Sequence, residues 1–331
     1  MPFRIPRRSL LCSLPGLATL ACGNRKAPSE LRLALMPTLN QAGFFLAQEL
    51  GLFAKYGLKL KVEQLTRPEH VTALLAGGRI DIGFTSLNPA FINAVAAGAR
   101  IRVVAGRNVL SPACGAIGTL YVNRKMFPHG LTDVRQLSGK RVSVPVPTSA
   151  AAFFLDTMLA TGGLSSAQLN MVYLPDAEAI IALESGRLDA MVCLLDQSPA
   201  ALSPEILSVM RPVDIIPGHQ WSFIVFGRTL LNGDLSAGTR FLAACLEGAR
   251  AFAAGQTPRF LSELARSQGL DPKRAWGGCR GAFSPDGRID EPSVRRYVDW
   301  VVRRGFSPRT LPIGSLIDTR FVDALRAGKG L

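Results

Sequence analysis

Apolar positions along the chain follow two alternating spacings, and together these predict a mixed α/β protein. Short apolar runs such as Leu31–Met36 and Ile101–Ala105 have the length and composition of buried strands. Between such runs, apolar residues recur at three- and four-residue spacing, as they do over the segment Gln41–Tyr56. We expect Asn40 to cap this helix and Gly57 to end it, because asparagine favours N-caps and glycine favours the left-handed C-terminal position.

The same periodicities predict further elements. Asn88 followed by Pro89 is a strong helix start, since asparagine caps the first turn and proline fits its backbone. Strands are predicted at 58–65, 79–85 and 221–227, and helices at 68–76, 236–254, 258–268 and 292–304. Alternation of strands and helices indicates a largely parallel sheet covered by helices.

The apolar pattern also repeats at an interval of 108 to 110 residues. Leu31–Leu46 matches Lys140–Leu155, and Gly78–Asp81 matches Gly186–Asp189 in the same order. Chance similarity of two apolar α/β segments is the alternative, and it is disfavoured because several matching blocks keep their order. Two similar α/β lobes in one chain form a cleft between them, which is a common place for small ligands.

The repeat divides the chain into lobes. We expect crossings between them near Thr119–Asn123 and Pro217–Phe223, and a chain that crosses twice forms a hinge that allows closure. The predicted division is a signal peptide at 1–21, a tether at 22–30, a first lobe at 31–118 and 218–331 with the C-terminal helices, and a second lobe at 119–217.

The N-terminus has the features of an export signal. Three arginines precede the apolar stretch Leu10–Ala21, which is too short to span a bilayer as a finished helix. Ala18–Cys22 is similar to a bacterial lipoprotein box, which implies a lipid anchor on Cys22 at the periplasm or the outer face of the cell membrane. The pair Arg7 and Arg8 fits either the general or the twin-arginine export route.

Charge and composition narrow the partners. The net charge is +14 at 48% hydrophobic residues, and a basic balance of this size favours anionic partners. The basic residues are scattered without an aromatic stripe, so we expect no nucleic acid partner. Of the six cysteines, Cys12 and Cys22 lie in the N-terminal segment, and the others show neither CxxC nor metal-ligand spacing. We therefore expect no disulfide framework and no metal site.

Cofactor and catalytic patterns do not emerge from the chain. It carries neither a GxGxxG nor a GxxxxGK[ST] loop, and its three histidines are scattered. No nucleophile and base occur at plausible spacing. We expect a protein that binds its ligand without transforming it and that needs no cofactor.

Four blocks of sequence carry a resemblance to a known family: Ala47–Leu58, Ala73–Gly83, Val95–Ala99 and Leu137–Val142. They resemble periplasmic solute-binding proteins of the nitrate/sulfonate/taurine and thiamine-precursor (pyrimidine) type, which feed ABC importers. The resemblance implies an α/β protein with the type II periplasmic binding protein fold, in which two similar lobes enclose a ligand cleft and a hinge. It also implies a monomer that delivers a small anionic or heterocyclic solute to an ABC transporter permease and ATPase complex. The alternatives are an enzyme of the thiamine-pyrimidine synthase-like branch of this fold and a ligand-sensing module of a signalling system.

The expected ligand contacts lie in loops that follow the predicted strands, because ligands of open parallel sheets sit beyond the carboxyl ends of the strands. Helix N-termini at these ends favour anions. Asp196 suits a ligand amine, Trp221 suits an apolar or aromatic solute, and Arg107 faces either an anion or solvent; helix capping and core packing are the competing roles. The predicted ligand-binding residues are Thr38, Asn40, Gln41, Ser86, Asn88, Thr148, Ser149, Asp196 and Trp221.

Overall fold

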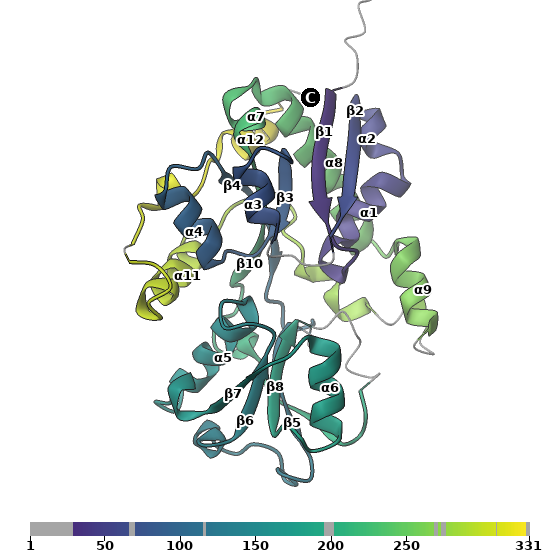
Figure 1. The fold of residues 1–331 in the computed structure, drawn as a ribbon. Coiled ribbons are helices and arrows are strands. Elements are labelled where there is room, and N and C mark those ends of the chain that lie inside the picture. Colours follow the sequence, from purple (N-terminus) through teal and green to yellow (C-terminus); the bar gives the residue numbers. More distant parts are fainter. Residues whose placement is uncertain are drawn as a thin grey trace, which may run out of the picture.

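Two five-stranded sheets, each with helices packed against it, make up the computed structural model (Figure 1). The structure describes residues 29–65, 70–114, 117–194, 202–267, 271–272, 276–308 and 310–328. The first sheet has the order β2-β1-β3-β10-β4, and we call this sheet with its helices the first lobe. The second sheet has the order β7-β6-β8-β5-β9 and, with its helices, forms the second lobe.

Both sheets are mixed in the same way. The first contains β1 (Ser29–Leu35), β2 (Leu58–Gln64), β3 (Ile82–Thr85), β4 (Arg102–Val109) and β10 (Gln220–Phe226). The second contains β5 (Ile117–Asn123), β6 (Arg141–Val144), β7 (Asn170–Tyr173), β8 (Ala190–Leu194) and β9 (Ile206–Met210). In each sheet one strand, β10 or β5, runs antiparallel to both of its neighbours, while the three strands on one side of it are parallel.

Helices cover both faces of the first sheet. One face, with α1, α2, α8 and α12, shares a buried cluster that includes Phe44, Phe53 and Phe241, and α3, α4 and α11 lie on the other face (Figure 1). The helices of this lobe are α1 (Ala42–Glu49), α2 (Leu52–Lys55), α3 (His70–Ala76), α4 (Pro89–Ala96), α7 (Arg228–Asn232), α8 (Leu235–Ala253), α9 (Arg259–Ser267), α11 (Glu291–Arg303) and α12 (Arg320–Arg326).

The second lobe has two longer helices, α5 (Ala150–Ala160) and α6 (Asp176–Glu184). Short 3-10 turns complete the fold at Leu39–Gln41, Val134–Leu137, Ser166–Gln168, Pro212–Asp214, Gly277–Ala282 and Ile313–Ser315. Within the described ranges, no helix has the length and apolar character needed to cross a membrane.

The predicted repeat is visible as a matching ion pair in each lobe. Arg32 Nη2 lies 2.8 Å from Asp81 Oδ1, and Arg141 Nη2 lies 2.7 Å from Asp189 Oδ1. In both lobes the same arginine donates its backbone N–H to the other carboxylate oxygen and donates Nη2 to the carbonyl of the glycine three residues before the aspartate. We call these pairs the two braces. Each ties a strand, β1 or β6, to the residue that directly precedes its parallel neighbour, β3 or β8.

Several predicted elements agree with the structure and others do not. The strands and helices predicted at 58–65, 221–227, 236–254 and 292–304 correspond to β2, β10, α8 and α11 with ends shifted by one residue. The predicted helix Gln41–Tyr56 is instead two helices, α1 and α2. Gly51 lies between them and adopts a left-handed backbone with φ of 67°, which interrupts the helix. Asn40, which the sequence analysis predicts as a helix cap, lies inside the 3-10 turn Leu39–Gln41 and does not cap a helix.

Two further predictions need correction at the passage between the lobes. The segment Thr119–Asn123, predicted as a crossing, is part of β5 and pairs with both β8 and β9. Cys114 and Cys279 form a disulfide, with Cα atoms 4.2 Å apart, although no disulfide framework was expected. The two residues are 165 positions apart, so their pairing leaves no local spacing pattern. Cys193 and Cys245 are buried thiols, as expected for small core residues.

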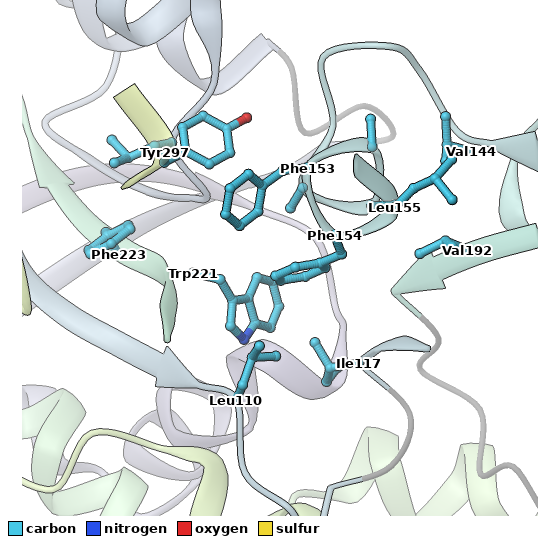
Figure 2. Close-up of a cluster of buried hydrophobic side chains, with 14 of the residues drawn as sticks. Leu110, Ile117, Val144, Phe153, Phe154, Leu155, Val192, Trp221, Phe223 and Tyr297 are labelled. Atoms are coloured by element: carbon cyan, nitrogen blue, oxygen red, sulfur yellow. The ribbon is translucent and has the colours of Figure 1, made fainter. Parts of the chain in front are cut away.

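A single buried apolar cluster continues from the first lobe into the second (Figure 2). Trp221 of β10 lies in it together with Leu110, Ile117 and Phe154, and the last two belong to strands and helices of the second lobe. Burial of this much apolar surface joins the lobes firmly on the side of α5 and α11.

Hydrogen bonds reinforce that junction. Trp300 of α11 donates its Nε1 hydrogen to Asp156 Oδ2 of α5 at 2.7 Å, and the Tyr297 hydroxyl donates to the carbonyl oxygen of Thr148 at 3.3 Å. Helix α11 packs against β10 of the first lobe and thus also contacts the second lobe directly.

Candidate ligand site

The edges of the two sheets that face each other are the carboxyl ends of their parallel strands. The chain leaves the first sheet at Val109 of β4, whose partner is Gln220 at the start of β10. It enters the second sheet at Ile117 of β5, whose partner is Leu194 at the end of β8. Because only a short segment joins Val109 to Ile117, the two edges lie near one another. The carboxyl ends of β1, β3 and β4 and those of β6, β7 and β8 therefore point toward the region between the two sheets, which is where ligands of open α/β sheets bind.

A small cavity of about 20 Å³ opens at this edge of the first lobe. A space of this size fits one water-sized group. Its polar lining comes from the 3-10 turn after β1, from β4 and from the segment that follows the turn Gly277–Ala282; these residues are Asn40, Gln41, Arg107 and Ser284. Its apolar lining includes Phe84 and Cys245.

Glycines allow the helices beside the cavity to approach each other. A Cβ on Gly248 of α8 would lie 2.1 Å from the carbonyl oxygen of Gly43 in α1. A Cβ on Gly106, the residue before Arg107, would lie 1.9 Å from the side-chain nitrogen of Gln220. Side chains at these positions would force the backbone apart. The glycines thus permit a tightly packed wall around the arginine.

Arg107 is the charged residue of this cavity. Its guanidinium carbon lies 4.8 Å from the centre of the Phe84 ring, and its Nε donates to Asn108 Oδ1 at 3.1 Å. Nη1 is buried and has no hydrogen-bond partner among the described residues. Burial lowers the pKa of Arg107 to about 9, so the side chain is still protonated at neutral pH.

The neighbouring thiol does not balance that charge. Burial raises the pKa of Cys245 well above its ordinary value, and the thiol is neutral. In the part of the chain that the structure describes, no carboxylate forms an ion pair with Arg107. Burying an unpaired cation is costly, so a counter-charge from outside the chain would stabilise this site.

Three of the predicted contact residues gather beside Arg107. Asn40 and Gln41 line the cavity, and Gln41 is 8% exposed. The Thr38 hydroxyl donates to Gln41 Oε1 at 2.6 Å, which fixes the orientation of the amide. The loop after β1 therefore presents polar groups at the position that the sequence predicts.

The other predicted residues occupy different places. Asn88 caps α4, because its Oδ1 accepts from the backbone N–H of Phe91 at 2.9 Å. Its Nδ2 donates to the carbonyl of Ser86 at 3.4 Å. Ser149 caps α5, and its Oγ accepts from the backbone N–H of Ala152 at 3.2 Å. Ser86, Asn88 and Ser149 do not line the cavity. Their ligand contacts stay predictions.

Thr148 and Trp221 belong to the junction between the lobes. The Thr148 carbonyl oxygen accepts a hydrogen bond from the Tyr297 hydroxyl of α11. Trp221 is 6% exposed, and its Nε1 has no acceptor within the described ranges (Figure 2). The indole thus packs in the apolar cluster. Two predicted residues, Asp196 and Cys22, lie outside the residues that the structure describes.

Asp176 is a charged residue of the facing edge that the sequence analysis missed. It begins α6, directly after β7, and the backbone N–H of Leu194 at the end of β8 donates to its carboxylate. Its Oδ1 is buried without a partner in the described structure. Burial raises the pKa of Asp176 to about 6, and the bond from Leu194 only partly offsets this. In the sequence, an aspartate after Pro175 indicates only a helix start.

Metal ligation has no candidate in the described parts of the chain, where no three His, Cys, Asp or Glu side chains come together. The candidate site is instead a small cavity of the first lobe, and its charged residue is Arg107.

A family model described as NMT1/THI5 like matches residues 38–256, which include the whole second lobe, most of the first and all of the cavity lining except Phe283 and Ser284. The chain belongs to the NMT1/THI5-like family. This confirms the family resemblance predicted from the four sequence blocks. A comparison with curated proteins gives no match.

Solved structures share the fold of this NMT1/THI5-like chain. The periplasmic aliphatic sulphonate binding protein SsuA from Escherichia coli has a TM-score of 0.73 at 21% identity, over 88% of this chain and 92% of that one. The periplasmic nitrate-binding protein NrtA from Synechocystis PCC 6803 has a TM-score of 0.66 at 11% identity, over 91% and 89%. The desulfurization enzyme DSZB has a TM-score of 0.61 at 13% identity, over 91% and 99%. The type II periplasmic binding protein fold is thereby confirmed.

Proposed function

We propose that this chain captures a small anionic solute, of the sulfonate or nitrate class, and delivers it to an ABC transporter permease. The observation that carries the proposal is the buried, unpaired Nη1 of Arg107 at a cavity on the facing edge of the first lobe. An oxyanion supplies both the missing hydrogen-bond acceptor and the missing negative charge.

Other features of the molecule favour the same ligand class. The net charge of +14 attracts anions from solution before they reach the cavity. A neutral heterocycle, such as a thiamine precursor, would leave Arg107 without a counter-charge. Two proteins of the same fold are named for sulphonate and nitrate binding, and both of these ligands are oxyanions.

Delivery and location are part of the proposal. The N-terminal signal and Cys22 support export and a lipid anchor, which would hold the receptor near a permease and its ATPase. A chain carrying Cys22→Ser should then be released from the membrane fraction. If both forms fractionate alike and Cys22 carries no lipid by mass spectrometry, the anchor is excluded.

Binding without chemistry is favoured over the enzymatic alternative. The fold also occurs in a desulfurization enzyme, so fold alone does not decide between binding and catalysis. The only free thiol on the described lining of the cavity is Cys245, and its raised pKa keeps it protonated and a poor nucleophile. Ligand recovered unchanged after long incubation with the protein would agree with this; turnover above background would contradict it.

Calorimetric titration of the chain lacking residues 1–21 tests the proposal. Ethanesulfonate and nitrate serve as anionic probes, and a neutral aminopyrimidine serves as the comparison. Arg107→Met should weaken anion binding by about 100-fold or more, because a charged hydrogen-bond donor is lost from a buried site. Arg107→Lys should keep part of the affinity, since the charge remains while the planar fork is lost.

Arg79→Met is the matched control, because Arg79 is an exposed arginine of the same lobe away from the cavity. It should bind the anions as the wild type does. Far-ultraviolet circular dichroism checks that each variant is folded. Equal anion affinity in the wild type and in a folded Arg107→Met protein would remove this site, and binding of the pyrimidine alone would replace the ligand class.

A further inference from the structure

One wall of the cavity comes from a segment far along the chain. Phe283 and Ser284 belong to its lining, and we call these two residues the C-terminal wall. The backbone N–H of Ser284 donates to the carbonyl oxygen of Arg107 at 2.6 Å, and Phe283 forms an antiparallel bridge with Asn108 of β4. Because β4 is the last strand of its sheet, the wall covers part of its open edge. The position of the C-terminal wall therefore shapes the cavity beside its charged residue.

The disulfide lies directly before this wall. Cys279 is part of the 3-10 turn Gly277–Ala282, and the wall begins at the first residue after that turn. Cys114 lies on the passage that leads from β4 to β5. The backbones of the turn and the passage pack closely, since a Cβ on Gly278 would lie 2.1 Å from the carbonyl oxygen of Ala113. The disulfide thus joins the turn to the passage at a point of close approach.

The turn and the passage each have a further anchor. Arg280 Nη1 donates to the carbonyl oxygens of Phe252 and Gln256 at 2.7 and 2.8 Å, which fixes the turn to the end of α8. Arg211, directly after β9, donates from Nη1 to the carbonyl oxygen of Pro112 at 3.0 Å, which ties the passage to the second lobe. The disulfide therefore connects a wall of the first-lobe cavity, through the passage, with the second lobe.

We infer that the disulfide holds the C-terminal wall in its binding position, so that the oxidised protein binds its anion more tightly than the reduced protein does. The inference rests on the proposed function and adds control by redox state to it. A wall that a covalent bond already orders loses less conformational entropy when the ligand binds. Without this bond, the contacts with β4 and α8 hold the wall, and part of the binding free energy is used to order it.

Reduction of the disulfide is an exchange with an external dithiol such as dithiothreitol. One thiolate of the dithiol attacks a sulfur of the Cys114–Cys279 bond, and its second thiolate then resolves the mixed disulfide. Two electrons and two protons pass to the protein, which gains two thiols, while the dithiol becomes a cyclic disulfide. The two cysteines are only 5% and 8% exposed, so a reductant reaches them poorly and a double serine variant is needed beside chemical reduction.

Calorimetric titration with nitrate and ethanesulfonate compares three forms of the chain lacking residues 1–21. All of them carry Cys22→Ser, which removes a cysteine that could pair elsewhere. The forms are the oxidised parent, the parent reduced with dithiothreitol, and the double variant Cys114→Ser/Cys279→Ser. The reduced parent and the double variant should bind both anions about fivefold or more weakly than the oxidised parent. Titration of thiols in the unfolded protein verifies each oxidation state.

Asp189→Ala is the matched control for a general loss of stability. It removes the brace of the second lobe, away from the cavity lining, and should keep the anion affinity of the oxidised parent. Hydrogen exchange followed by mass spectrometry gives a local readout, because the N–H of Ser284 is bonded to Arg107. The peptide that contains Ser284 should exchange faster in the double variant than in the oxidised parent and in Asp189→Ala. Circular dichroism checks that each form is folded.

Each outcome decides a separate point. Equal anion affinity in the oxidised parent, the reduced parent and a folded double variant would refute the redox control and leave anion capture in place. Equal losses of affinity in Asp189→Ala and in the double variant would refute it too, because the loss would then follow overall stability. If the double variant does not fold, the reduced parent decides the question. If the oxidised parent binds neither anion, the proposed function itself fails, while exchange at Ser284 still shows whether the disulfide orders the wall.

Discussion

The two lobes agree where they fold and differ where they face each other. Each contains a brace of the same geometry, Arg32 with Asp81 and Arg141 with Asp189, and in each the aspartate is almost fully buried beside a half-exposed arginine. At the facing edges the likeness ends, because the first lobe has Arg107 and the second has Asp176, and each has a buried polar atom without a partner among the residues that the structure describes. The duplicated residues build the scaffold, and the charged residues at the facing edges are not duplicated.

The braces and the edge charges also differ in their electrostatics. Burial alone would raise the pKa of Asp81 and of Asp189, but hydrogen bonds from the arginine side chain and backbone outweigh it, and both values are lowered. Burial of Asp176 outweighs the hydrogen bond from the backbone N–H of Leu194, and its pKa is raised to about 6. A buried carboxylate thus stabilises a lobe when its partner is in the chain and destabilises it when the partner is absent.

Removal of a brace should have the largest effect on stability. Asp81→Ala and Asp189→Ala should each lower the free energy of unfolding by about 3 kcal/mol, since each removes a buried carboxylate that accepts from both the backbone N–H and the side chain of an arginine. Urea denaturation followed by circular dichroism measures the change. Asp214→Ala serves as the control, because the Arg211–Asp214 pair is exposed on both sides and should contribute less than about 1 kcal/mol.

Equal losses in the two lobes would show that the two braces contribute equally to stability as well as sharing the same geometry. A loss confined to one lobe would mean that the other brace is replaceable by surrounding contacts, and the lobes would then differ in their scaffolds too.

The braces should also be sensitive to acid. Their aspartates have lowered pKa values in the folded protein, so their stabilisation is present above the unfolded value near 4 and is lost as pH falls through the folded values. The stability difference between the wild type and Asp189→Ala, about 3 kcal/mol at pH 7, should therefore shrink below about pH 4. Denaturation curves from pH 7 to pH 2.5 measure it; a difference that stays constant would exclude the ion pair as its source.

Asp176→Asn should have the smallest effect, and the effect should have the opposite sign. The folded protein binds the proton of Asp176 more tightly than the unfolded chain does, so this residue costs stability as pH rises from about 4 through 6. The variant without ligand should be more stable than the wild type by about 1 kcal/mol at pH 7.5 and equal to it at pH 4. Thermal denaturation at both pH values measures this. A variant that is less stable at pH 7.5 would mean that Asp176 has a structural partner.

The sequence predicted the scaffold well because scaffold signals are local or repeated. Asn88 before Pro89 caps α4 as predicted, and the recurrence of Arg32 and Asp81 as Arg141 and Asp189 marks the braces. The single helix predicted over 41–56 failed at one residue, Gly51, whose left-handed backbone the apolar pattern does not reveal.

Of the candidate site, the sequence predicted only the part that comes from the loop after β1. Asn40 and Gln41 line the cavity as the loop after β1 predicts, although their contact with ligand is still to be tested. Arg107 was placed beyond a strand ending at Ala105, because the pairing that extends β4 to Val109 comes from β10, more than a hundred residues away. The burial of Asp176 likewise depends on distant parts of the chain, and no local pattern records it.

The disulfide between Cys114 and Cys279 depends on the redox conditions of the compartment in which the protein lies. One sulfur lies just before the second lobe and the other follows it, so oxidation encloses the whole second lobe in a covalent loop. Thiols of this kind stay reduced in the cytosol and pair in oxidising compartments. Under the proposed export, the two cysteines would be a dithiol before the chain meets an oxidising compartment and a disulfide afterwards. The oxidation state of this one pair would then report which side of the membrane a given molecule has reached.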